Sequence, residues 1–142
     1  MDPAAIFSIA NAVAPLGWLA LALSPLAPRL LVPFGGVAVP LALSALYAVT
    51  AALALPGAEG GFGSLAAVMT LFAQPGPALA GWIHFLAFDL LVGGWEVRDA
   101  RRRGVPHWAV LPCLLLTFML GPVGLLAYLA AGAALARKET LA

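Results

Sequence analysis

Four apolar stretches, each long enough to cross a lipid bilayer, constrain the fold of this chain more than any other sequence feature. A helix that spans a membrane needs about 20 mostly apolar residues. The stretches that meet this requirement are residues 6–26, 31–55, 78–97 and 108–135. We therefore predict an all-α polytopic membrane protein, a bundle of four transmembrane helices that forms a single domain over residues 1–142.

The composition also favours a lipid environment over an aqueous one. Hydrophobic residues make up 63% of the chain and charged residues only 9%, and the mean hydropathy is +1.04. Because soluble domains are about one quarter charged, this little charge could not cover a water-exposed surface. The net charge of +1 gives no reason to expect a nucleic-acid partner. The single cysteine, Cys113, excludes a disulfide within the chain and is interpreted as a small apolar side chain.

Breaks between the apolar stretches divide the chain further. A segment rich in glycine, residues 56–61, ends the second stretch, and residues 64–72 that follow are apolar but too short to span. We predict that residues 64–72 form a short helix along the membrane interface. Gly121-Pro122 falls near the middle of the fourth stretch. Since proline removes a backbone hydrogen bond, we expect a kink in one long helix there.

Basic residues predict the orientation, because they concentrate in cytoplasmic connections. Arg29 lies in the first connection, and Arg98 and Arg101–Arg103 lie in or near the third, whereas only Arg137 and Lys138 follow the fourth stretch. We therefore predict a bacterial inner-membrane protein with a cytoplasmic Arg101–Arg103 loop and both termini in the periplasm. The arginine cluster is most simply a topology signal, and binding of anionic lipid head groups is the alternative.

The third stretch carries most of the polar side chains that fall within the predicted spans. Polar groups in a membrane are costly, so each suggests a function. At 100° per residue, Asp89 and Glu96 lie about 20° apart, and His84 and Asp99 fall within a fan of about 140°. Asp89, near mid-membrane, is the strongest candidate for catalysis or ligand binding. A structural hydrogen bond between helices is the alternative interpretation.

Other polar residues are expected at particular depths. His84 lies toward the outer side, where an interfacial histidine bonded to water is the alternative to a functional role. Asn11, Tyr47, Thr50 and Tyr128 are expected near the level of His84, and Asn11 is expected to bond across helices. A structural polar network at the cytoplasmic end is predicted for Glu96, Arg98, Asp99 and His107.

A metal site has weak support. We expect no metal, and if one were bound, His84 and Asp89 would be the ligands, with Asn11 as a third. His107 is expected roughly 20 Å from His84 along the membrane normal, which argues against a site that contains both histidines.

Residues 82–90 read Trp-Ile-His-Phe-Leu-Ala-Phe-Asp-Leu, and Pro122-Val123-Gly124 follows in the last stretch. This pattern resembles the abscisic-acid-deficient-four-like family of small membrane proteins over residues 72–130. The arginines at 101–103 depart from the plant pattern. The positions that match the family are Trp82, His84, Asp89, Asp99, His107, Pro122 and Gly124.

The resemblance implies a function in carotenoid metabolism. Plant members of the family are plastid proteins needed to form neoxanthin from violaxanthin. By this likeness the chain would be a membrane enzyme that isomerises an epoxy-carotenoid or related isoprenoid without a cofactor. Asp89 and His84 would supply the acid–base chemistry. The expected substrate-binding residues are Trp82, Phe85, Phe88, Trp95, Asn11, Tyr47 and Thr50, although the aromatic ones would equally suit a lipid-facing surface.

Three other functions stay open at this point. The first is oxidative cleavage of a carotenoid to retinal, which would need iron. The second is a non-catalytic membrane protein that binds carotenoid or assists assembly. The third is a small transporter, whose substrate flux would depend on Asp89. The glycine and alanine content would also permit close packing in a homodimer.

Overall fold

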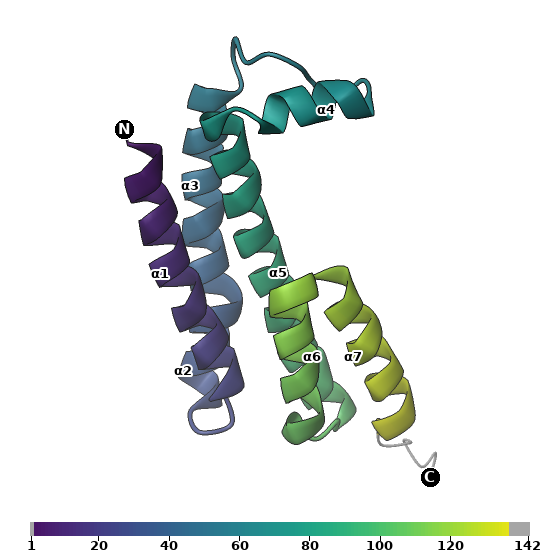
Figure 1. The fold of residues 1–142 in the computed structure, drawn as a ribbon. Helices are drawn as coiled ribbons and strands as arrows, with labels where there is room; N and C mark the ends of the chain where they lie inside the picture. Colours follow the sequence, from purple (N-terminus) through teal and green to yellow (C-terminus); the bar gives the residue numbers. More distant parts are fainter. Residues whose placement is uncertain (1, 137–142) are drawn as a thin grey trace.

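The computed structural model describes residues 2–136, and its regular elements are all helical over this range, which confirms the all-α class (Figure 1). The elements, in chain order, are α1 (Pro3–Ala22), α2 (Pro28–Pro33), a π-helical segment η1 (Phe34–Ala38), α3 (Val39–Ala54), α4 (Leu65–Phe72), α5 (Pro75–Arg103), α6 (His107–Leu120) and α7 (Pro122–Leu135).

Three helical stretches are long and apolar enough to cross a membrane. They are α1 with 20 residues, the continuous run α2–η1–α3 over Pro28–Ala54 with 27 residues, and α5 with 29 residues. They correspond to the first three predicted spans and lie alongside one another in the bundle (Figure 1). The chain therefore has the helices of a membrane protein. These three stretches supply most of the buried core, and α6 and α7 complete it.

The fourth predicted span differs from the expectation of one kinked helix. The backbone turns at Gly121, which has φ 48° and ψ −100°, and α6 and α7 fold back against each other as a hairpin (Figure 1). Each has 14 residues, so each is roughly 21 Å long and shorter than the hydrocarbon core of about 30 Å. The break is complete because the positive φ of Gly121 precedes Pro122, which has no N–H to continue the helix.

The hairpin determines where the end of α7 lies. The Nη2 of Arg103 donates to the carbonyl oxygen of Gly132 at 3.1 Å, so the last turn of α7 lies at the arginine end of α5. The first turn of α1 lies at the opposite end of the bundle (Figure 1). The predicted placement of both termini on one side required a fourth full crossing, and the described part of the chain has a reversal instead. Arg137 and Lys138 lie outside the described residues.

Glycines allow α1, η1 and α5 to pack closely. A Cβ atom on Gly36 would lie 2.9 Å from the Cα of Gly94, and one on Gly35 would lie 2.5 Å from the carbonyl oxygen of Gly17. Real Cβ atoms do not approach other atoms this closely. The absence of side chains at these positions therefore sets the separation of the helices, as in other membrane bundles.

An arginine fastens η1 to α5. The Nη1 of Arg98 donates to the carbonyl oxygen of Gly36 at 3.1 Å. This bond joins the second span directly to the arginine end of α5.

The predicted short helix after the second span is confirmed as α4, which lies across one end of the bundle (Figure 1). The hydroxyl of Ser64 caps it by accepting from the N–H of Ala67 at 3.1 Å. The side chain of Gln74 accepts from the N–H of Glu59 at 3.1 Å and donates to its carbonyl oxygen at 2.8 Å, which ties down the preceding loop. Its position at a membrane interface stays a prediction.

Gly124→Ala should destabilise the hairpin. A Cβ atom on Gly124 would overlap the backbone nitrogen and side chain of Thr117 on α6, and such overpacking typically costs about 1–3 kcal/mol. Gly63→Ala is the matched control, because its Cβ would meet no atom within 4 Å. Thermal unfolding of the purified protein in detergent measures both. Equal stability of the two variants would contradict this packing of α6 on α7.

Candidate functional site

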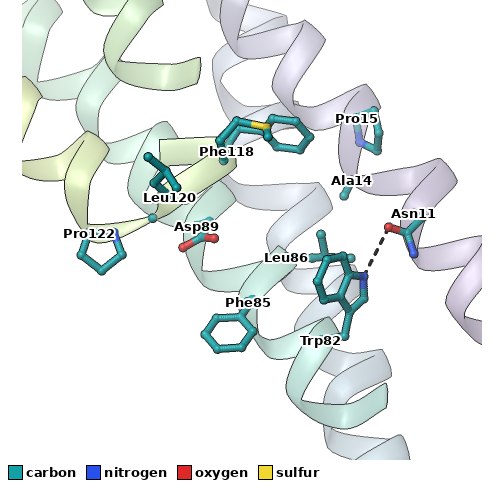
Figure 2. Close-up of a pocket in the computed structure, with 12 residues that line it drawn as sticks. Asn11, Ala14, Pro15, Trp82, Phe85, Leu86, Asp89, Phe118, Leu120 and Pro122 are labelled. Atoms are coloured by element: carbon teal, nitrogen blue, oxygen red, sulfur yellow. Dashed lines mark hydrogen bonds between the residues drawn. The ribbon is translucent and has the colours of Figure 1, made fainter. Parts of the chain in front are cut away.

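A largely apolar cavity lies where the tip of the α6–α7 hairpin meets α5 and α1 (Figure 2). Its volume is about 460 Å³, within the range of about 300–1,000 Å³ that is usual for small-molecule sites. We call it the hairpin-tip pocket. The residues that line it are Asn11, Ala14, Pro15, Trp82, Phe85, Leu86, Asp89, Phe118, Met119, Leu120, Gly121 and Pro122.

Asp89 supplies the acidic group of the hairpin-tip pocket (Figure 2). It projects from the middle of α5 toward the turn at Gly121, where an added Cβ would lie 2.8 Å from its Oδ1. The partly buried Asp89 carboxyl forms no hydrogen bond with another group of residues 2–136. The structural helix-to-helix bond considered for Asp89 is thus not formed within that range. The carboxyl is free to meet a ligand in the pocket.

Asn11 and Trp82 join α1 to α5 on the wall of the same pocket. The Nε1 of Trp82 donates to the Oδ1 of Asn11 at 3.3 Å (Figure 2), and the Nδ2 of Asn11 donates to the carbonyl oxygen of Phe7 at 2.8 Å. The expectation that Asn11 bonds across helices is therefore confirmed. Trp82 and Asp89 are seven residues apart, so this pair lies roughly 10 Å from Asp89 along the helix axis.

His84 lies in a different cavity from Asp89. This second cavity, the α4 pocket, has a volume of about 210 Å³, and Tyr47, His84 and Phe85 are among the residues that line it. The imidazole stacks on Phe88 with ring centroids 4.5 Å apart and meets the ring of Tyr47 edge-on at 5.4 Å. Five residues of helix turn His84 about 140° away from Asp89. Phe85 lines both cavities and lies between the two predicted catalytic residues.

The remaining predicted substrate-binding residues are dispersed. Phe85, Trp82 and Asn11 lie at the hairpin-tip pocket and Tyr47 at the α4 pocket. The hydroxyl of Thr50 donates to the carbonyl oxygen of Leu46 on its own helix at 2.8 Å. Trp95 lies near the arginine end, where its ring meets that of Tyr128 edge-on at 5.4 Å.

One family of known proteins shares its sequence pattern with this chain. The family model described as ABA DEFICIENT 4-like matches residues 5–128, which include every residue of the hairpin-tip pocket. The chain belongs to the ABA DEFICIENT 4-like family. Membership confirms the resemblance drawn from the sequence and implies a role in carotenoid- and neoxanthin-related processes. No curated protein and no solved structure matches the chain.

In this ABA DEFICIENT 4-like protein the four residues predicted as one polar network have separate partners. Asp99 accepts from Tyr128 at 2.8 Å, from Arg102 at 3.3 Å and from Arg103 at 3.4 Å. The Nε2 of His107 lies 2.9 Å from the carbonyl oxygen of Ala22 at the end of α1. Arg98 bonds to η1, and Glu96 bonds within the core.

Tyr128 also differs from its predicted depth. The sequence placed it near the level of His84, on the assumption that the last apolar stretch runs straight across the membrane. Because α7 turns back, Tyr128 lies at the level of Asp99 instead, and its side chain is fully buried. The reversal at Gly121 thus accounts for this error.

Glu96 is a fully buried carboxyl in the core between α5 and α6. Its Oε1 accepts from the hydroxyl of Thr117 at 2.8 Å, and its Oε2 has no hydrogen-bond partner among the described residues. Thr117 precedes Gly121 by one helical turn. The bond therefore holds α6 against α5 just below the turn that faces Asp89, and Glu96 positions the hairpin-tip pocket.

The residues at the hairpin tip were missing from the predicted site. Phe118, Met119 and Leu120 belong to an apolar run whose composition does not distinguish them from lipid-facing residues. The signal that could have located them is Gly121-Pro122, if it is interpreted as a turn instead of a kink. Asp89, which lies near the same predicted depth, would then have indicated where the turn contacts α5.

The donor set for a metal is sparse. Among residues 2–136, no three His, Cys, Asp or Glu side chains are grouped so that they could hold a metal ion. His84 and Asp89, the two ligands proposed for that case, line different cavities. Within residues 2–136, His84 and Asp89 therefore do not converge as the pair of iron ligands that the oxidative alternative would require.

Thr117→Val should destabilise the protein by about 1–3 kcal/mol, because both oxygens of the buried Glu96 would then lack a partner. Thr50→Val is the control: Thr50 is also buried, but its hydroxyl bonds only to its own helix. We expect the control to lose clearly less stability, because valine at this position leaves no buried carboxyl without a partner. Thermal unfolding in detergent measures the stability of both variants. An equal loss of stability in both would show that the Glu96–Thr117 bond has no special role.

Proposed function

We propose that this protein is a membrane enzyme that isomerises an epoxy-carotenoid or a related isoprenoid, with Asp89 as the reacting group. The observation that supports the proposal is a carboxyl without a protein hydrogen bond in residues 2–136 that faces a mostly apolar cavity of about 460 Å³. Family membership supports the substrate class. A hydrophobic substrate would enter such a cavity from the lipid bilayer.

The chemistry needs no external reagent. Conversion of an epoxide beside a vinylic C–H into an allenic alcohol breaks the C–H bond and one C–O bond of the epoxide. The proton leaves the carbon, the electron pair of the C–H bond forms the new double bond, and the epoxide oxygen gains a proton. One carboxylate, Asp89, could accept the proton from carbon and return it to oxygen. A single acid–base group at the reacting centre therefore suffices, and no cofactor is required.

The second cavity would then contact another part of the substrate. A carotenoid is longer than the hairpin-tip pocket, and Phe85 lines both that pocket and the α4 pocket. We propose that His84, Tyr47 and Phe88 form an aromatic surface for the part of the polyene that extends past Phe85. In this arrangement His84 binds substrate and Asp89 performs the proton transfer.

Asp89→Asn should lower product formation at least about 100-fold, the minimum usual contribution of general acid–base catalysis. The protein is expressed in bacteria that accumulate epoxy-carotenoids, and the extracted pigments are separated by chromatography. Asp2→Asn is the control, because Asp2 caps α1 at an exposed site and asparagine also caps helices. Wild-type yield from Asp89→Asn would refute the proposed role of Asp89.

The same assay distinguishes the other functions. Unaltered pigment that co-purifies with the protein would indicate a carotenoid-binding protein. Shortened aldehyde products would indicate oxidative cleavage.

His84→Phe should reduce product formation by less than about tenfold, because phenylalanine keeps the stacking contact with Phe88 and loses only the ring nitrogens. The assay is the pigment separation used for Asp89→Asn. A loss as large as that of Asp89→Asn would instead support direct participation of His84 in proton transfer.

We further propose that the arginine end faces the cytoplasm of a bacterial inner membrane. The five basic residues of the described range, Arg29, Arg98 and Arg101–Arg103, lie at this end, as cytoplasmic ends require. Three helices would cross the bilayer, and the α6–α7 hairpin would enter from the cytoplasmic side and return to it.

Single cysteines test this topology in a Cys113→Ser background. A membrane-impermeant maleimide added to intact cells with a permeabilised outer membrane should label Ala4→Cys, and should label Arg102→Cys and Leu135→Cys only after the inner membrane is opened. Labelling of Leu135→Cys together with Ala4→Cys would instead restore a fourth full crossing.

A further inference from the structure

A separate groove lies at the opposite end of α5 from α4, between α2 and the last turns of α5. Its volume is about 630 Å³. Guanidinium groups and apolar surface share its walls, and none of the described residues that line it is acidic. We call it the arginine groove, and the side chains that matter here are Arg29, Arg98, Arg101, Arg102, Val32 and Trp95.

We propose that the arginine groove binds the phosphate group of an anionic amphiphile, in the first place the head group of an acidic phospholipid. Guanidinium groups match phosphate oxygens through paired, charge-assisted hydrogen bonds. The apolar surface of Val32 and Trp95 beside them would accommodate the start of an acyl chain. This site is independent of the proposed chemistry at Asp89.

The positive charge of the groove is poorly compensated. Asp99 pairs with Arg102 at 3.3 Å, but it also accepts from Arg103 and Tyr128. Arg29 and Arg101 form no hydrogen bond or ion pair with any group of residues 2–136. The groove therefore keeps at least two guanidinium groups with all their donors available.

The groove is built by two segments that are far apart in the sequence. Arg29 lies on α2, whereas the other three arginines lie on α5. The bond from Arg98 to Gly36 and the close contact of Gly36 with Gly94 hold these two walls together. A topology signal requires only positive charge on one side of the membrane. Convergence of distant arginines on one concave, partly apolar surface is what a binding site for a charged amphiphile requires.

Lipid binding to the purified full chain tests the proposal. In a neutral detergent, which provides no charged surface, short-chain lipids are titrated and native mass spectrometry counts the lipids retained. The lipids are anionic phosphatidylglycerol and zwitterionic phosphatidylcholine, whose choline cation would be repelled by the arginines. We expect preferential retention of phosphatidylglycerol. Arg29→Gln and Arg101→Gln should each weaken it about tenfold, the loss expected when a hydrogen bond to a charged group is removed.

Arg103→Gln is the matched control, since it removes the same charge at the same end but outside the groove, where Arg103 bonds to Gly132 and Asp99. It should change retention less than twofold. Inorganic phosphate is then added as a competitor of the lipid. If it displaces phosphatidylglycerol from the wild type and Arg29→Gln abolishes this effect, the groove recognises phosphate from either source. If it displaces no lipid, the groove recognises the lipid head group. Equal retention of both lipids, or an equal effect of Arg103→Gln, would overturn the proposal.

Discussion

The turn at Gly121 brings the tip of the α6–α7 hairpin against the middle of α5, where Asp89 lies. The turn favours glycine because its φ of 48° is one that other residues rarely adopt, and an added Cβ would also displace the Asp89 carboxyl. The hydrogen bond between Glu96 and Thr117 holds the hairpin one turn away from that tip. The depth of the hairpin-tip pocket, and the position of the C-terminal end of α7, both depend on this reversal.

Several polar groups in the apolar bundle are matched by partners that fasten one helix to another. Arg98 bonds to the carbonyl of Gly36, Tyr128 to Asp99, and His107 contacts the end of α1 at Ala22. Such bonds replace the water that lipid cannot provide. The Asp89 carboxyl forms no such bond within residues 2–136, and its position in a cavity of ligand size is the reason for assigning chemistry to it.

Two surfaces at different depths thus have different chemical character. The hairpin-tip pocket combines one carboxyl with apolar walls, and suits a nonpolar substrate that carries a reactive oxygen. The arginine groove combines guanidinium groups with apolar surface, and suits an anionic head group. α5 contributes to both, with Asp89 near its middle and Arg98 and Arg101 near its end, so one helix connects the two surfaces.

The sequence by itself determined the helical class, the three long spans, the short helix α4, the family and the importance of Asn11 as a bond between helices. Length and hydropathy suffice for the helices because a helix in lipid must be long and apolar. The family follows from the pattern at residues 82–90, and the Asn11 bond from the need of an amide within a span for a partner. The sequence could not decide whether Gly121-Pro122 bends a helix or reverses it, since both outcomes use the same two residues. Only the tertiary structure decided that, through the packing of Gly124 on Thr117 and the bonds of Thr117 and Tyr128 to α5. It likewise placed His84 and Asp89 in different cavities, because the α6–α7 hairpin covers the Asp89 side of α5 and α4 covers the His84 side.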